Sequence, residues 1–182
     1  MKALSGRQPW WWAILHAGKR VENRVWNTTY RGPIILHAAK GCTVDEYEGA
    51  LIWMENVGVI DNIKSAPGLK DMQRGGIVGR ARIVDVLLPA VGRIGPCGCA
   101  HRLDVDARWH MHDQYGFVLE DVEALPFVPW RGELGLFNLP DDYTVRANAA
   151  PPLRPRELGL FNLPDDYAVR ANAAPPLRPR GE

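Results

Sequence analysis

The chain has 182 residues, a formal net charge of +1, 46% hydrophobic residues and seven tryptophans. This composition excludes a disordered body, because disordered chains are poor in aromatic residues and rich in charge. No window approaches about 18 uninterrupted apolar residues, so we expect neither a transmembrane helix nor a membrane partner. The N-terminal stretch MKALSGRQP lacks the apolar region of a signal peptide, which predicts a cytoplasmic location.

The charge is unevenly distributed along the chain. Residues 1–40 hold seven lysines and arginines against the single carboxylate of Glu22. A basic segment on a nearly neutral chain favours a local anionic site, such as a phosphate or a short stretch of nucleic acid. It argues against wrapping of duplex DNA, where affinity grows with the number of neutralised phosphates.

The first predicted elements are a short strand over Lys2–Ser5 and a helix over Trp10–His16. Pro9 suits the first turn of that helix, and Gly18 provides a left-handed stop after it. We expect two of the helical tryptophans, Trp11 and Trp12, to lie in the core.

Two segments rich in β-branched and aromatic residues follow, Val21–Trp26 and Pro33–Ala38, and we predict that they pair as strands around the turn between them. Thr43 and Glu46 have the spacing of a capping box at the start of a second helix. Gly58 is placed to end that helix. Its predicted buried face consists of Val44, Tyr47, Leu51 and Met54.

The later elements are shorter strands separated by irregular connections. Alternation over Ile77–Leu88 predicts a strand with Arg80 and Arg82 on its solvated face, although the two arginines could also extend an anion-binding track. Tyr115–Leu119 and Gly135–Leu139 complete the predicted strands. The expected fold class is therefore α+β, mainly β: a small, mostly antiparallel β-barrel with about two helices.

The C-terminal part of the chain is a tandem duplication. Glu133–Arg156 is repeated as Glu157–Arg180 with one difference, Thr144 against Ala168. Two nearly identical copies without a third do not make a solenoid, whose stacked units share a core. We therefore expect a domain over residues 1–140, a tail over 141–156, and a second copy over 157–182 that is loose and offers a route to self-association.

An ordered series of short motifs carries a family resemblance. Lys19, Glu22 and Arg24 form a Lys-x-x-Glu-x-Arg motif directly after Gly18. The other matching segments are Ala3–Trp10, Tyr30–Pro33, Leu36–Lys40, Gln114–Leu119 and Gly135–Phe137. Together they resemble the ASCH family of the PUA-like superfamily over about residues 2–140. Many relatives have a glycine two positions before the lysine, where this chain has Ala17.

The resemblance implies a PUA-like barrel with a cleft lined by the Lys, Glu and Arg of the motif. It also implies a role in binding RNA or a modified nucleotide. One small bacterial branch resembles an amidohydrolase acting on acetylated cytidine, so a small hydrolase, either of this kind or a ribonuclease, is the alternative. Lys19 matches the lysine of that branch, whereas the branch has threonine at the position of Glu22. Lys19 and Glu22 are therefore the catalytic candidates if the protein is an enzyme.

From the residues alone, an ordinary surface ion pair is the favoured interpretation of Lys19, Glu22 and Arg24, and the ASCH resemblance reverses that preference in favour of a ligand site. On a strand, Glu22 and Arg24 project from the same face, and Lys19 enters from the preceding turn. Arginine offers a planar fork to phosphate or a base edge, and glutamate accepts from an exocyclic amine. Arg7, Gln8 and Trp10 lie just upstream and are the remaining ligand-binding candidates, since tryptophan can stack on a base.

No metal or other cofactor is expected. Cys97, Cys99, His101, His110 and His112 could be interpreted as zinc ligands, but their spacing does not fit the usual Cys-x2-Cys framework. His37 lies in an apolar segment and is predicted to be a satisfied core histidine.

Overall fold

The computed structural model describes residues 1–60, 64, 66–89, 106–140 and 142. No helix within these ranges is long and apolar enough to cross a membrane. The second repeat copy, the predicted tail after residue 142 and the Cys97–His101 segment lie outside them.

The structure is a six-stranded sheet with two α-helices. Its strands are β1 (Lys2–Gly6), β2 (Val21–Arg24), β3 (Gly32–Ala38), β4 (Gly76–Leu87), β5 (Tyr115–Pro129) and β6 (Leu136–Asn138). The helices are α1 (Trp10–His16), α2 (Val44–Asn56) and a short 3-10 turn over Ala107–Trp109. The strand order is β2-β5-β4-β3-β1-β6, with β1 parallel to β3 and antiparallel to β6.

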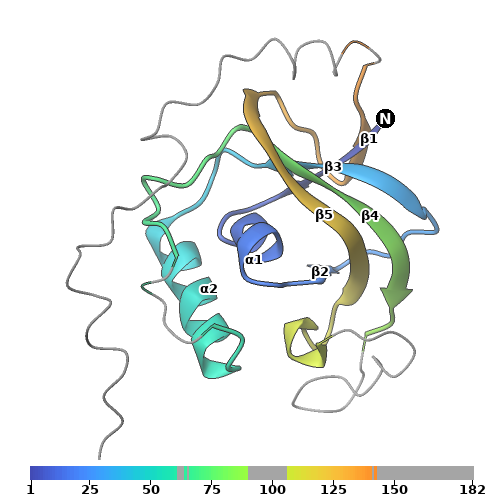
Figure 1. Cartoon of the computed structure of the whole chain (residues 1–182). Coiled ribbons are helices and arrows are strands. Elements are labelled where there is room, and N and C mark those ends of the chain that lie inside the picture. Colours follow the sequence, from blue (N-terminus) through green and yellow to red (C-terminus); the bar gives the residue numbers. More distant parts are fainter. Residues whose placement is uncertain (61–63, 65, 90–105, 141, 143–182) are drawn as a thin grey trace, which may run out of the picture.

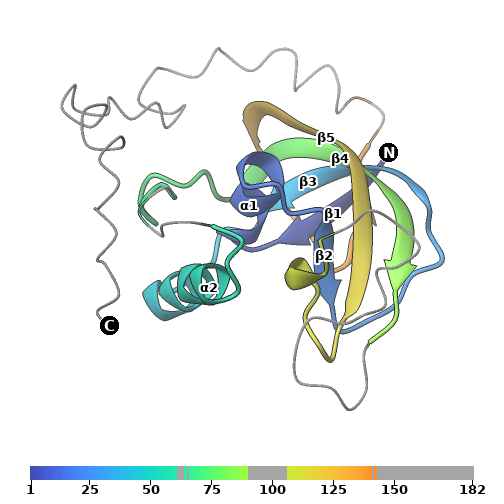
Figure 2. The same cartoon turned by 60° about the horizontal axis from the view of Figure 1, so that its bottom comes forward.

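The long strands β4 and β5 curl the sheet into a half-barrel around α1 (Figure 1). Three register shifts along the β4–β5 pair accompany this bend, and irregular pairing of this kind increases local twist. A second view shows α1 against the concave face of the sheet, with α2 standing apart (Figure 2). The main core accordingly joins Trp11 and Ile14 of α1 to sheet residues such as Leu36 and Phe117.

Helix α1 is held in this concavity by Trp11, which is completely buried. Its indole nitrogen donates a 2.7 Å hydrogen bond to the carbonyl of His37 on β3. A Cβ at Gly6 would approach the Trp11 ring to 2.6 Å, so the missing side chain at the end of β1 makes room for the indole. This packing fixes the segment that leads from β1 through α1 to the candidate site.

The structure confirms the expected fold class, a small α+β protein dominated by a barrel-like, mostly antiparallel sheet. The predicted pairing of Val21–Trp26 with Pro33–Ala38 is wrong. Strand β2 pairs with β5, in the register Arg24↔Tyr115, whereas β3 pairs with β1 and β4. The predicted strand at Tyr115–Leu119 is also too short, because β5 continues along β4 to Pro129.

The second helix follows the sequence prediction closely. Thr43 and Glu46 make both hydrogen bonds of the capping box, and Gly58 adopts a positive φ of 66° after the helix end. Tyr47, Leu51 and Met54 are buried as expected, but Val44 in the first turn is 55% exposed. The hydrophobic pattern therefore placed the face correctly and extended it one residue too far toward the N-terminus.

Candidate functional site

The turn after α1 carries Lys19 into the interior. Gly18 has a φ of 73°, the left-handed conformation that glycine adopts without steric cost. The amide of Lys19 then bonds to the carbonyl of Ala13, which closes the helix end. As a result the Lys19 side chain points inward and only 1% of it is exposed. A lysine buried to this extent needs compensating partners.

Lys19, Glu22 and Arg24 form one buried ion cluster, called the Lys-Glu-Arg cluster below. Lys19 Nζ lies 3.0 Å from Glu22 Oε2 and also donates to the carbonyl of Val21. Arg24 Nη2 lies 3.0 Å from Glu22 Oε1. The glutamate thus holds one cation on each oxygen, as the same-face geometry of residues 22 and 24 on a strand predicts.

Burial lowers the pKa of Lys19, while the charge and hydrogen bond of Glu22 raise it and the charge of Arg24 lowers it further. The ammonium also lies 5.5 Å from the ring centre of Trp10, within the range of a cation–π contact. Lys19 is therefore an amine that loses its proton more readily than an exposed lysine does, held under an indole ring.

Arg24 connects the cluster to the surface. Its side chain is 17% exposed, against 7% for Glu22, so it is the most accessible member. Nη2 also donates a 2.5 Å hydrogen bond to the carbonyl of Ser5 near the end of β1. Within the described ranges, the buried Nε has no hydrogen-bond partner. A buried donor without a protein partner is uncommon in native structures.

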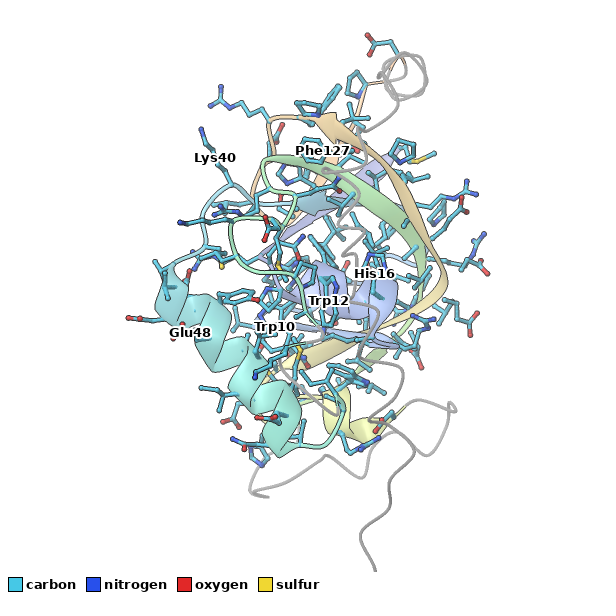
Figure 3. The ribbon with its side chains drawn as sticks, turned by 60° about the vertical axis from the view of Figure 1, so that its left-hand side comes forward. Trp10, Trp12, His16, Lys40, Glu48 and Phe127 are labelled. Atoms are coloured by element: carbon cyan, nitrogen blue, oxygen red, sulfur yellow. The ribbon has the colours of Figure 1, made fainter. Side chains whose placement is uncertain are left out.

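An aromatic wall lies beside the cluster. Trp10 packs edge-on against Trp53 of α2 at a centroid distance of 5.6 Å, and Trp53 lies 6.4 Å from Trp109. Trp10 occupies the space between α1 and α2 (Figure 3) and is only partly buried. This geometry leaves an indole at the margin between the cluster and solvent.

Residues 4–124 match the sequence profile of the ASCH domain, a span of more than half the chain. The chain belongs to the ASCH family. No curated protein gives a significant match to the sequence. The curled sheet described above agrees with the PUA-like barrel expected of an ASCH domain.

The other two upstream candidates lie apart from the ionic contacts of the ASCH motif. Gln8 is 5% exposed, and its amide is used on backbone groups, accepting from the Trp12 nitrogen and donating to the Gln73 carbonyl. Arg7 is exposed and forms an ion pair with Glu46 of α2. Gln8 therefore anchors the loop that follows β1, whereas Arg7 lies at the surface next to that loop.

Two contributors to this region were not among the sequence candidates. Asn23 donates to the carbonyl of Trp109 and accepts from the amide of Met111, each at 2.9 Å, so it ties β2 to the segment before β5. Trp53 forms the α2 side of the aromatic wall. The position of Asn23 between Glu22 and Arg24 could have indicated that it contributes to this region. Nothing in the motif points to Trp53, because that residue lies in α2.

The histidines near β5 have local partners. His110 bonds the carbonyl of Gln114 at 2.8 Å, and His112 lies 2.8 Å from a carboxylate oxygen of Asp113. Over the part of the chain that the structure describes, no group of three metal-ligating side chains occurs.

Proposed function

We propose that this ASCH domain binds single-stranded RNA or a modified nucleotide, with the base at the Lys-Glu-Arg cluster. The observation that carries the proposal is the buried charged cluster, whose most accessible member, Arg24, is partly exposed. A buried ion cluster is weak support for stability, because apolar side chains of similar size often stabilise a core equally well. Packing alone does not explain why three charged side chains are buried together, whereas recognition of a ligand does.

The chemistry of the cluster suits a nucleobase. Arg24 supplies a planar set of donors for a base carbonyl or ring nitrogen, and Glu22 can accept from an exocyclic amine. Trp10 lies above Lys19 and offers an indole face or edge to the base. Stacking on an aromatic side chain contributes roughly 1–3 kcal/mol per base in single-strand binders.

The test is a fluorescence titration of the full chain with a short single-stranded RNA, followed through tryptophan emission. Lys19→Ala with Arg24→Ala is expected to weaken binding by at least about tenfold, since two charged contacts are lost. Circular dichroism establishes that the variant is folded, and Lys19→Met serves as the milder change. Arg80→Ala with Arg82→Ala is the matched control, because it removes two cations from the ion-paired outer face of β4. Unchanged binding in the folded cluster variant would rule out this site.

The same cluster also supports a hydrolase, the second candidate function. The favouring observation is the buried Lys19 amine, 3.0 Å from the Glu22 carboxylate. Burial lowers the pKa of Lys19, and a buried amine with a lowered pKa is suited to act as a base or nucleophile. For an acetylated cytidine-like nucleoside, water would add to the acetyl carbonyl and the amide bond would break, releasing acetate and the free exocyclic amine. A ribonuclease would instead break a phosphodiester bond at the same place.

Mass spectrometry with acetylated nucleosides and with labelled RNA separates the two candidates. Turnover that disappears in Lys19→Ala supports the hydrolase. Binding without turnover in the wild-type chain contradicts it and leaves the binding function standing.

A further inference from the structure

Four segments far apart in the sequence meet at one end of the sheet. Strands β1 and β3 are parallel and in register at Gly6↔Ala38, so they end side by side. The amide of Ala39 bonds the carbonyl of Gly6 at 2.8 Å, and the amide of Gly75 bonds the carbonyl of Ala38 at 2.8 Å. Gly75 directly precedes β4, and its carbonyl accepts from the amide of Trp130 after β5.

Each of these segments brings a cation to that end. Arg7 follows β1, Lys40 follows β3, Arg74 precedes β4, and Arg131 follows β5. We call these four residues the strand-end patch. Arg74 Nη1 lies 3.5 Å from the carbonyl of Lys40, and Lys40 projects outward from the body (Figure 3). Arg7, Lys40 and Arg131 are exposed, and Arg74 is partly exposed.

The thiol of Cys42 lies in the field of two of these cations. Burial raises the pKa of Cys42, and the charges of Arg74 and Arg7 both oppose that shift. Beside the patch, Pro129, Trp130, Arg131, Gly132 and Glu133 line an open surface hollow of about 670 Å³.

The strand-end patch differs in its pairing from the arginines on the outer face of the sheet. Four surface arginines outside the patch are matched by carboxylates: Arg31 with Asp85, Arg80 with Glu123, Arg82 with Asp121 and Arg108 with Asp106. The exposed Arg20 instead donates to the backbone carbonyls of Ile14 and Lys19. In the patch only Arg7 has such a partner, Glu46. Lys40, Arg74 and Arg131 form no ion pair with any described residue. Neighbouring cations without counter-charges favour a polyanionic ligand.

The patch borders the Lys-Glu-Arg cluster through the end of β1. Arg24 bonds the carbonyl of Ser5, and Arg7 lies two residues farther along the same segment. Gln8 bonds the carbonyl of Gln73, next to Arg74. A chain with one residue at the cluster can therefore continue over this end of the sheet.

We propose that the strand-end patch binds backbone phosphates of the single-stranded RNA whose base lies at the Lys-Glu-Arg cluster. This proposal rests on the proposed function and adds the direction in which the RNA leaves the base site. The partner is a phosphodiester chain rather than a free base, because the patch offers several neighbouring cations at the surface.

The test measures the salt dependence of binding for a short single-stranded RNA to the full chain. The variant carries Lys40→Gln, Arg74→Gln and Arg131→Gln, and the control carries Arg31→Gln, Arg80→Gln and Arg82→Gln, with the same change in net charge. For single strands, the slope of log K against log salt is about −0.7 per neutralised phosphate. The slope of the patch variant should therefore be shallower by about 2, while the control keeps the wild-type slope.

A parallel titration with an uncharged nucleoside separates this proposal from the proposed function. The patch variant should bind the nucleoside with wild-type affinity, since it leaves the Lys-Glu-Arg cluster intact. The patch proposal is wrong if the folded patch variant keeps the wild-type slope, or if the slope of the control changes by an equal amount. In either case, nucleoside binding still supports the base site. A wild-type chain that binds no RNA overturns the patch as well.

Discussion

Glu22 is the residue on which the Lys-Glu-Arg cluster depends, because it is the shared anion between two cations. Lys19 and Arg24 each lie 3.0 Å from a different oxygen of its carboxylate. If that charge is removed, a buried ammonium and a partly buried guanidinium are left facing a neutral side chain. The free energy of unfolding should fall substantially, since an uncompensated buried charge is costly.

Glu22→Gln is therefore expected to lower the free energy of unfolding by about 3–5 kcal/mol, measured by urea denaturation. Combining it with Lys19→Met should recover part of that loss, because the buried cation is removed with its partner. A double variant less stable than Glu22→Gln alone would contradict the assigned role of the cluster.

His37 is a core histidine, as its apolar surroundings predict. It is 3% exposed. Its Nε2 lies 3.0 Å from the carbonyl of Trp130, which can only accept, so this nitrogen carries the proton. Nδ1 is then free to accept from the hydroxyl of Ser5, also at 3.0 Å. Burial lowers the pKa of His37, although its bond to Trp130 acts in the opposite direction.

This shift predicts that acid weakens the fold. Below the usual histidine pKa of about 6.5, the unfolded chain binds a proton that the buried His37 side chain resists. The free energy of unfolding therefore decreases as the pH is lowered below that value. Urea denaturation between pH 7.5 and pH 5.5 should show a smaller decrease in His37→Gln than in wild type. The pKa values of His16 and His110 are also lowered by burial, so some decrease remains in the variant. Identical pH profiles would contradict the prediction.

The contacts within the cluster could be predicted from spacing, but its burial could not. The period of a strand places Glu22 and Arg24 on one face, and Gly18 indicates a turn that brings Lys19 close. Charged residues are exposed by default, however, so the same pattern equally suits a surface ion pair. The burial of Lys19 comes from tertiary packing that includes Trp10, which no local pattern describes.

At the scale of elements, α2 shows where sequence reasoning is dependable. The capping box is a local motif whose two hydrogen bonds require only Thr43 and Glu46. Strand partners are different, because a turn such as Thr28–Gly32 suggests pairing of the strands around it. Strand β2 instead pairs with β5, about ninety residues farther along the chain. Pairing between strands this far apart depends on tertiary packing, and that information is not local.

Helix α2 also provides a measurable element-level effect. Thr43→Ala removes the side-chain oxygen that accepts from the Glu46 amide and should cost about 1 kcal/mol of stability. Thr43→Ser keeps that oxygen and serves as the control in thermal denaturation. Equal losses in the two variants would show that the hydroxyl contributes nothing.

For the whole molecule, the duplicated segment offers two candidates for one edge strand. Strand β6 pairs with β1, and Phe137 within it and Leu139 directly after it are 5% and 3% exposed. The sequence Leu136–Asn138 recurs unchanged at Leu160–Asn162. We expect the second copy to be able to replace β6, in the same chain or in a neighbouring one, since the identical side chains fit the same surface.

A chain ending at Arg156 should therefore fold and associate less than the full chain. Phe137→Ala is expected to cost about 3–5 kcal/mol in that truncated chain, and less in the full chain, where Phe161 remains available. Phe161→Ala in the full chain is the control and should leave stability unchanged. Equal losses from Phe137→Ala in both lengths, measured by urea denaturation, would show that the second copy does not substitute.

The position of β1 between β3 and β6 has a consequence for biosynthesis. The partners Lys2 and Asn138 lie at opposite ends of the described domain, and Met1 and Leu139 bond each other's backbone just beyond them. While the chain is still being made, β1 can join β3 early, but its other edge must wait until β6 has left the ribosome. During that interval the unpaired edge of β1 exposes Ala3 and Leu4 and can pair with a strand of another chain. The risk of misassembly is therefore greatest in the period of synthesis before β6 emerges.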